Sequence, residues 1–245
     1  MICRVFGSPW SRALDVCSNH MKTVILIDTS IQGAALGVAD LETGRLMAWV
    51  YHDTNMGAAQ RLPELLHQVL QKAQLPLSAI DAVAVSHGPG SFTGIKVGLA
   101  FAQGLVAGMQ TQPRIWSCSG LGAGAVYIAR QMSQEVAIFL PQTKTKGCVV
   151  KATADDHDIE VADLDDGASD RLILLGESSF AATPWPALEA KFEAKGRKLV
   201  GISLLPEPLL YGMAEQARQA WPDQFKMTMP QALYLRPSTV EEKLS

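Results

Sequence analysis

The sequence lacks several features that would assign it to a familiar functional class. No apolar stretch reaches the roughly 20 residues that a membrane-spanning helix needs, and the longest one, at 97–109, also contains Gln103. The four cysteines form no C-x-x-C pair, which is typical of reduced thiols in a cytoplasmic protein. The five histidines show no zinc-binding spacing. These absences argue against a membrane protein, a disulfide-stapled secreted protein and a zinc protein.

Charge is also scarce in this chain. Charged residues make up 18% of the sequence and the formal net charge is −3, which argues against unaided electrostatic binding to nucleic acid. Any role with RNA would therefore need a partner that supplies the basic surface. Hydrophobic residues make up 48% of the 245 residues, so the chain can bury a sizeable core in one large domain or two small lobes.

The first 20 residues read poorly as part of the fold. They carry neither a sustained apolar core nor a small-residue cleavage site, so they do not resemble a signal peptide. A strong strand pattern begins directly after Met21 and Lys22. We therefore expect residues 1–20 to be a disordered extension or the product of an upstream-extended gene start. The remainder is expected to form an N-terminal lobe at 21–131 and a smaller, divergent C-terminal lobe at 132–245.

Hydrophobic periodicity predicts an α/β chain. In the first half it predicts three strands, a helix, a strand, a helix, a strand and a helix, an order that is the repeating half of an actin-like or sugar-kinase-like ATPase lobe. These elements are expected at 24–27, 35–39, 46–51, 62–73, 82–85, 94–109, 115–117 and 120–132. The second half predicts a hairpin at 136–140 and 148–153, strands at 159–162, 171–175 and 199–203, and helices at 187–195 and 206–220.

Asp28, Thr29 and Ser30 end the first buried strand of this pattern. Actin-like ATPases hold phosphate and magnesium at this position, so the three residues are candidate phosphate ligands. An aspartate followed by serine or threonine also closes strands as an Asx-turn, which is a purely structural use. Both interpretations stay open from the sequence.

Gly88, Gly90 and Ser91 lie in a glycine-rich loop between a predicted strand and a predicted helix. Such a loop places backbone N–H groups at a helix N-terminus, where a phosphate can bind. The Walker A spacing fails, however, because the glycine that closes the loop is not followed directly by lysine. Capping of the helix by a loop hydroxyl is the structural alternative.

The helix after this loop is unusually rich in small residues. Glycine inside a helix costs roughly 0.5–1 kcal/mol relative to alanine, so close packing must compensate for it. One row of small residues can pack within the lobe while a second row faces a partner. The two rows at i+4 spacing are Gly94, Gly98 and Ala102, and Ala100, Gly104 and Gly108.

The sequence shows no nucleophile–base pair, no paired carboxylates and no metal signature beside these motifs. We therefore predict no catalytic residues and no metal site. A nucleotide-type fold without a visible catalytic set indicates a scaffold. The alternative is a self-sufficient actin-like ATPase or small-molecule kinase that uses Asp28.

Three segments closely resemble the TsaB (YeaZ) family: I-L-I-D-T-S at 25–30, G-P-G-S-F-T-G-I-K-V-G at 88–98 and Y-L-R at 234–236. The resemblance implies an actin-like, sugar-kinase-like (ASKHA) fold of two lobes with βββαβα-type mixed sheets. It also implies a non-catalytic scaffold subunit in the N6-threonylcarbamoyladenosine modification of tRNA, which pairs with the catalytic subunit TsaD and thereby recruits the ATPase TsaE. No cofactor of its own is implied, ATP or magnesium would enter only in the complex, and contact with tRNA would be indirect.

We expect two helices, Leu62–Leu70 and Gly94–Gly108, to meet TsaD, and to form a homodimer when TsaD is absent. The sequence departs from the family at Gly57, where a histidine is common, and at 142–149, where a D-A-R-x-G-E-V-Y segment is usual. Both departures are typical of a divergent branch of the family and bring the function of the second lobe into question. The predicted interface residues are Leu62, Leu65, Leu66, Val69, Gly94, Val97, Gly98, Phe101 and Ala102.

Overall fold

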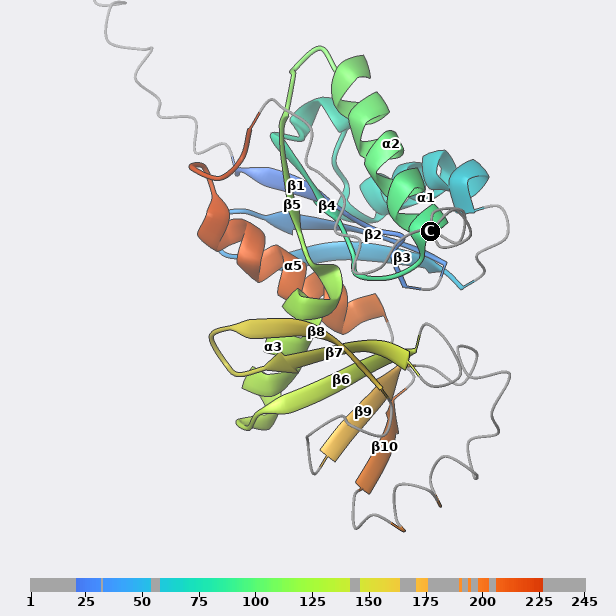
Figure 1. Cartoon of the computed structure of the whole chain (residues 1–245). Helices are drawn as coiled ribbons and strands as arrows, with labels where there is room; N and C mark the ends of the chain where they lie inside the picture. The colour runs from blue at the N-terminus through green and yellow to red at the C-terminus, as the bar shows by residue number, and fades with distance from the viewer. Residues whose placement is uncertain are drawn as a thin grey trace, which may run out of the picture.

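Two five-stranded mixed sheets form the framework of the chain, which is described from a computed structural model (Figure 1). The structure describes residues 21–31, 33–53, 58–141, 146–163, 171–175, 190, 194, 198–202 and 206–226. The predicted extension at 1–20, most of the helix expected at 187–195 and the Y-L-R segment lie outside these residues.

The first sheet has the strand order β3-β2-β1-β4-β5. β1 pairs antiparallel with β2 and parallel with β4, so it is the central strand, and its six residues are all buried. A continuous apolar run suits a strand covered on both faces. The five strands are β1 (Thr23–Asp28), β2 (Ala34–Asp40), β3 (Leu46–His52), β4 (Ala82–Ser86) and β5 (Arg114–Cys118).

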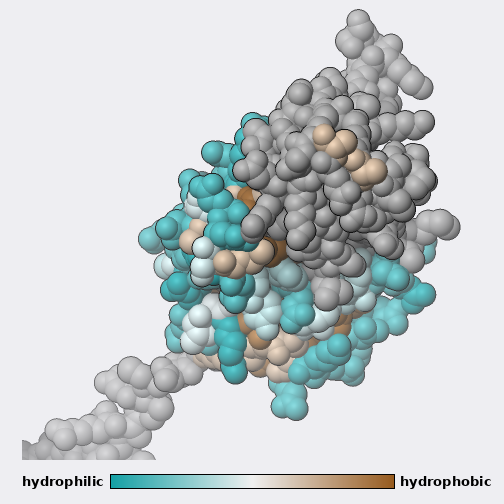
Figure 2. Space-filling view, turned by 90° about the horizontal axis from the view of Figure 1, so that it is seen from below, coloured by the Kyte–Doolittle hydropathy of each residue, from teal (hydrophilic) through white to brown (hydrophobic). Residues whose placement is uncertain are grey.

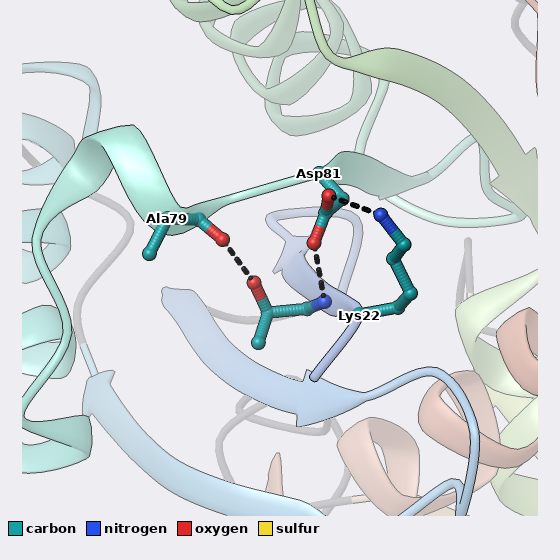
Figure 3. Close-up of polar contacts among 4 residues, drawn as sticks. Lys22, Ala79 and Asp81 are labelled. Carbon is teal, nitrogen blue, oxygen red and sulfur yellow. Dashed lines mark hydrogen bonds and ion pairs between the residues drawn. The ribbon is translucent and has the colours of Figure 1, made fainter. Parts of the chain in front are cut away.

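Side chains at the start of β4 fix the start of β1 (Figure 3). Asp81 accepts hydrogen bonds from the Thr23 amide at 2.9 Å and from Lys22 Nζ at 3.2 Å, and the Thr23 hydroxyl donates to the Ala79 carbonyl at 2.6 Å. These contacts hold the two parallel strands in register at their N-terminal ends. As a consequence, their C-terminal ends meet at one edge of the sheet.

Two helices cover one face of the first sheet (Figure 1). They are α1 (Ala58–Ala73), which packs on β2 and β3, and α2 (Phe92–Gly108), which packs on β1, β4 and β5. A short 3-10 helix, η2 (Leu77–Ala79), follows α1. The sequence places Pro63 best in the first turn, but α1 begins at Ala58 and Pro63 lies inside it. The carbonyl that loses its helical donor belongs to exposed Ala59, where water can satisfy it.

The second sheet repeats the topology of the first. Its order is β10-β9-β6-β7-β8, and its central strand β6 pairs antiparallel with β7 and parallel with β9. The sheet therefore has three antiparallel strands followed by two parallel strands, as in the first lobe. Its strands are β6 (Val136–Pro141), β7 (Lys146–Ala152), β8 (His157–Asp163), β9 (Arg171–Leu175) and β10 (Lys198–Ile202).

Two crossing helices lie between the sheets (Figure 1). α3 (Gly120–Met132) follows the first sheet in sequence but packs on β6, β7 and β8 of the second. α5 (Pro206–Ala220) follows the second sheet but packs on β1, β2, β3 and β5 of the first. The two helices also pack on each other, with the Tyr127 and Tyr211 rings stacked at 5.2 Å between centroids. Each lobe is thus completed by a helix from the other half of the chain.

The described part of the surface is largely hydrophilic in the view of Figure 2, with small hydrophobic areas between the polar residues. The described hydrophobic residues gather instead in three buried clusters: one between the first sheet and α1 and α2, one between that sheet and α5, and one between α3 and the second sheet. Among the described residues, no helix combines the length and apolarity needed to cross a membrane.

Candidate functional site

The carboxyl ends of β1 and β4 meet in a buried polar centre. Asp28 Oδ1 accepts hydrogen bonds from the Ser30 amide at 2.9 Å and from the Ser30 hydroxyl at 3.0 Å. Ser86 is the last residue of β4, and its hydroxyl oxygen lies 3.1 Å from that of Ser30. The same Ser86 oxygen accepts a hydrogen bond from the Gly120 amide at 3.2 Å. All of these side chains are buried. The centre is a closed hydrogen-bond network that joins β1, β4 and the start of α3.

Asp28 occupies the N-terminal end of α3. A Cβ added to Gly120, the first residue of α3, would lie only 2.0 Å from Asp28 Oδ2, so the carboxylate touches the helix backbone. Burial raises the pKa of the Asp28 carboxyl, and hydrogen bonds from Ser30 and Ser86 partly oppose that rise. A helix N-terminus attracts anions through its free N–H groups and dipole. Here the chain's own carboxylate takes the place that a phosphate would take.

The glycine-rich loop closes over the end of β1. The Ser91 amide donates to the Ser30 carbonyl at 2.5 Å, and the Thr29 hydroxyl donates to the Gly94 carbonyl at 2.7 Å. An added Cβ would lie 1.9 Å from the Ser30 carbonyl oxygen at Gly90 and 2.0 Å from the Thr29 carbonyl oxygen at Gly94. The two motifs are therefore two halves of one packed unit, because only glycine allows this approach.

Ser91 has the structural role that the sequence left open. Its side chain accepts a bond from the Gly94 amide at 3.2 Å and is the N-cap of α2. Together with the bonds above, this cap engages the side chains of Asp28, Thr29, Ser30 and Ser91 within the protein. Gly88, at φ +108°, leads the loop away from β4. The arrangement stabilises a strand-to-helix connection.

The two small-residue rows of α2 face in opposite directions. In the inner row Gly98 and Ala102 are buried and Gly94 is half-buried; a Cβ on Gly98 would lie 2.3 Å from Thr29 Oγ1. In the outer row, Ala100, Gly104 and Gly108 are exposed, and a Cβ on either glycine would have no described atom within 4 Å. The inner row therefore serves the lobe's own core. The outer row is a smooth helix surface that nothing in the described chain covers.

The side chains of α1 that the sequence assigns to an interface lie mostly in the core. Leu62, Leu65 and Val69 are 1%, 6% and 0% exposed and pack with β2, β3 and β4 residues. Leu66 is half-buried and lines a hollow of about 470 Å³ beside the C-terminal half of α1. The candidate surface thus shifts from the inner positions of both helices to the outer row of α2, flanked by half-buried Val97 and Phe101. That this surface meets a partner stays a prediction.

Sequence reasoning missed the parts of the polar centre that come from elsewhere in the chain. Ser86 and Gly120 complete it, although neither was a candidate. Ser86 could have been found, because adjacent parallel strands end at the same edge of a sheet. Nothing in a single sequence indicates that the amide of Gly120 reaches this centre. Within the described ranges, no three His, Cys, Asp or Glu side chains gather so that they could hold a metal ion.

Comparison with known proteins agrees with this fold. The family model of TsaD, described as tRNA N6-adenosine threonylcarbamoyltransferase, matches residues 55–134. Two curated relatives are both called tRNA threonylcarbamoyladenosine biosynthesis protein TsaB. The one from Buchnera aphidicola is 32% identical over 99 residues, or 40% of this chain and 43% of that protein. The one from Haemophilus influenzae is 35% identical over 86 residues, or 35% of each protein.

The chain covers less than half the length of these curated relatives. A solved structure described as YeaZ from Pseudomonas aeruginosa matches with a TM-score of 0.61 and 21% identity, over 88% of this chain and 100% of that one. The duplicated sheets with exchanged helices define an actin-like, sugar-kinase-like protein. Within that class, the names of the curated relatives confirm the resemblance of the sequence to the TsaB (YeaZ) family. The solved structure shares the fold.

Proposed function

We propose that this chain is a non-catalytic scaffold subunit that pairs with a TsaD homologue in the N6-threonylcarbamoyladenosine modification of tRNA. The outer row of α2, with the flanking Val97 and Phe101, is the surface that meets TsaD. Through the pair, the chain recruits the ATPase TsaE. It contacts tRNA only indirectly, acts in the cytoplasm, and uses ATP or magnesium only as part of the complex.

The observation that carries this proposal is the uncovered outer row of α2. Gly104 lies inside α2 and lowers helix stability, yet neither it nor Gly108 at the helix end has a described neighbour within 4 Å of an added Cβ that would compensate for the loss. A helix from a partner can supply that approach. Lys96 is the only charged residue of α2, so the outer face is nearly free of the charges that docking would have to desolvate. The names of the curated relatives support the pathway.

The alternative, an ATPase or kinase that uses Asp28, gains no support from the geometry. A phosphate or magnesium ligand must expose lone pairs to the interlobe side. Asp28 is 4% exposed, accepts bonds from Ser30 and touches the backbone of α3 through Oδ2. Its carboxylate is committed to holding the two lobes' elements together.

Replacement of Gly104 by leucine tests the docking surface. The substitution raises helix propensity and meets no described atom, so the isolated chain is expected to fold and melt like the wild type or slightly above it. A leucine in a close helix contact costs about 1–3 kcal/mol, so affinity for the TsaD homologue of the same organism should fall by about ten- to a hundredfold. Isothermal titration calorimetry with that homologue measures the change.

Gln219→Leu is the matched control, because Gln219 is exposed on α5, away from α2. It should leave affinity unchanged. Equal affinity for TsaD in the Gly104→Leu variant and the wild type would rule out this surface as the interface. When TsaD is absent we expect a homodimer through the same face. Added TsaD should dissociate it, which analytical ultracentrifugation would show.

A further inference from the structure

The hollow beside the C-terminal half of α1 has a largely apolar wall. Its volume is about 470 Å³, and α1, the turn after it and η2 all contribute to it. None of the described residues that line it is Asp, Glu, Lys or Arg, and the exposed polar ones are His67, Gln71 and Gln74. A group that fills this hollow therefore has no charge to desolvate. The apolar wall consists of Pro63, Leu66, Leu70, Leu75, Pro76 and Leu77.

The described chain begins close to this hollow (Figure 3). Lys22 pairs with Asp81 at 3.2 Å, and the Thr23 hydroxyl donates to the carbonyl of Ala79 at 2.6 Å. Ala79 is the last residue of η2, and Leu77, the first residue of that helix, lines the hollow. A 3-10 helix rises about 2 Å per residue, so η2 spans only about 6 Å between the two. The chain that precedes Lys22 is thus tied down beside the hollow.

The preceding segment carries an apolar pattern, although residues 1–20 lack a sustained apolar core. Trp10, Leu14 and Cys17 recur at the i, i+4, i+7 spacing of one helix face. Ser8 and Pro9 directly before them are typical of an N-cap and a first helical position. The sequence of residues 8–17 therefore favours a short amphipathic helix. A helix of this length is marginal by itself in water, so its apolar face needs a surface to cover.

We propose that residues 8–17 bind in the hollow and extend the core of the first lobe, with Trp10 and Leu14 packed against the leucines of its wall. The occupant is this segment of the same chain. Five residues separate Cys17 from Lys22 and span up to about 17 Å when extended, so the tether beside η2 allows the segment to reach the hollow. The inference does not depend on the proposed partner, because it concerns contacts within one chain.

The chemistry of the hollow suits a tryptophan in particular. An indole buries a large apolar surface, but its N–H group needs a hydrogen-bond acceptor when it is buried. The side-chain amide oxygens of Gln71 and Gln74 supply acceptors beside the leucines. Trp10 thus meets both an apolar wall and a polar partner there.

Disulfide trapping in the full chain tests the location of the segment. In a Cys3→Ser background, Gln71→Cys places a thiol at an exposed position of the hollow, and Gln219→Cys places one on exposed α5 at the other face of the first sheet. The two cysteines within the lobes are buried and do not compete. Mild oxidation should join Cys17 to the new thiol of the Gln71→Cys variant within one chain, and non-reducing peptide mass spectrometry detects the bond. The Gln219→Cys control should stay unlinked.

Thermal unfolding tests whether the segment packs there. Trp10→Ala should lower the unfolding midpoint by about 4–8 °C, because an apolar side chain leaves the hollow, and deletion of residues 1–20 should lower it at least as much. Arg12→Gln, on the opposite side of the same helical pattern, is the control and should leave the midpoint unchanged.

The proposal requires both results. It is overturned if the disulfide fails to form, if both introduced thiols react equally, or if Trp10→Ala melts like the wild type. A disulfide that joins two chains would overturn it as well, because the hollow would then hold the segment of a second copy. A lowered midpoint without the disulfide would place the segment on another surface.

Discussion

At the scale of single residues, the two motifs of this chain explain each other. Gly90, Gly94 and Gly98 are glycines because the Thr29–Ser30 backbone and the Thr29 hydroxyl occupy the space where their side chains would be. Asp28 in turn is buried because the loop and α3 close over it. The conspicuous residues of both motifs therefore maintain one connection between strand and helix, and the outer row of α2 is what remains available to a partner.

A matched pair of glycine substitutions should separate the two rows of α2. Gly98→Ala places a Cβ 2.3 Å from Thr29 Oγ1 and is expected to lower the free energy of unfolding by about 1–3 kcal/mol. Gly104→Ala meets nothing and should raise it by up to about 1 kcal/mol through helix propensity. Urea denaturation followed by circular dichroism measures both. Destabilisation by both variants would contradict the assignment of inner and outer rows.

The buried carboxyl of Asp28 should give stability an unusual pH dependence. Its pKa is raised in the folded state, so the native protein binds this proton more tightly than the unfolded chain does. The contribution of Asp28 to stability therefore grows as the pH falls through the folded pKa. The free energy of unfolding of the wild type, minus that of Asp28→Asn, should increase between pH 7 and about pH 4.5. Other carboxyls cancel in this difference, and a slope of opposite sign would contradict the raised pKa.

The sequence alone predicts which residues matter in these motifs, but not whether their side chains face the core or a partner. The failed Walker A spacing and the Asx-turn alternative at Asp28 leave a structural role open beside a phosphate site. The inward orientation of Gly98 cannot be read from the sequence, because both glycine rows have the same spacing. Leu62 and Val69 are also ambiguous, since an apolar helix face looks the same whether it packs on its own sheet or on a partner.

At the scale of elements, the helices that matter most are those that cross between the lobes. α3 and α5 approach until their backbones touch: a Cβ on Gly212 would lie 2.1 Å from the Ala123 carbonyl oxygen. The Tyr127–Tyr211 stack and the ion pair between Arg130 and Glu215 lie along the same crossing. The lobes are thus joined by a backbone contact that admits no side chain.

Gly212→Ala should force α3 and α5 apart where they cross. Because the added methyl group meets backbone atoms of α3, neither helix can adjust by rotating a side chain. We expect the free energy of unfolding to fall by about 1–3 kcal/mol and the near-ultraviolet circular dichroism of the stacked tyrosines to weaken. Gln219→Ala, at an exposed position of the same helix, is the control and should change neither quantity.

Elements are the level at which the sequence is most informative. Period and apolar runs predict β1, α3, β9 and α5 within a residue or two of their observed bounds, because each is a buried or strongly patterned segment. The start of α1 is predicted less well, since Pro63 suggests a later beginning than Ala58. Local sequence patterns do not predict the exchange of α3 and α5 between the lobes, because it depends on contacts between residues far apart in the chain.

At the scale of the whole molecule, the two lobes have one topology but different surroundings. The first lobe carries the motif-bearing strand ends and α2, and the matched region of the TsaD family model, 55–134, extends from this lobe into α3. The second lobe repeats the sheet topology of the first, and the matched region ends before its first strand, β6. Function should therefore depend mainly on the first lobe.

Complementation tests that expectation in the cell. A bacterial strain that lacks TsaB should recover N6-threonylcarbamoyladenosine in its tRNA when this chain is expressed together with the TsaD homologue of its own organism. Mass spectrometry of digested tRNA measures the modified nucleoside. The Gly104→Leu variant should fail to restore it, and Gln219→Leu should succeed. Full recovery with Gly104→Leu would show that tRNA modification does not require the proposed surface.

The exchange of α3 and α5 also constrains how the protein can be made. The face of the first sheet that carries Val24, Leu26 and Ala84 is covered by α5, which the ribosome completes only at residue 220. Until then the nascent first lobe exposes an apolar sheet face, the kind of surface that invites aggregation. A fragment ending before Pro206 would keep that face exposed permanently. The first lobe therefore cannot complete its fold during synthesis until α5 has been made.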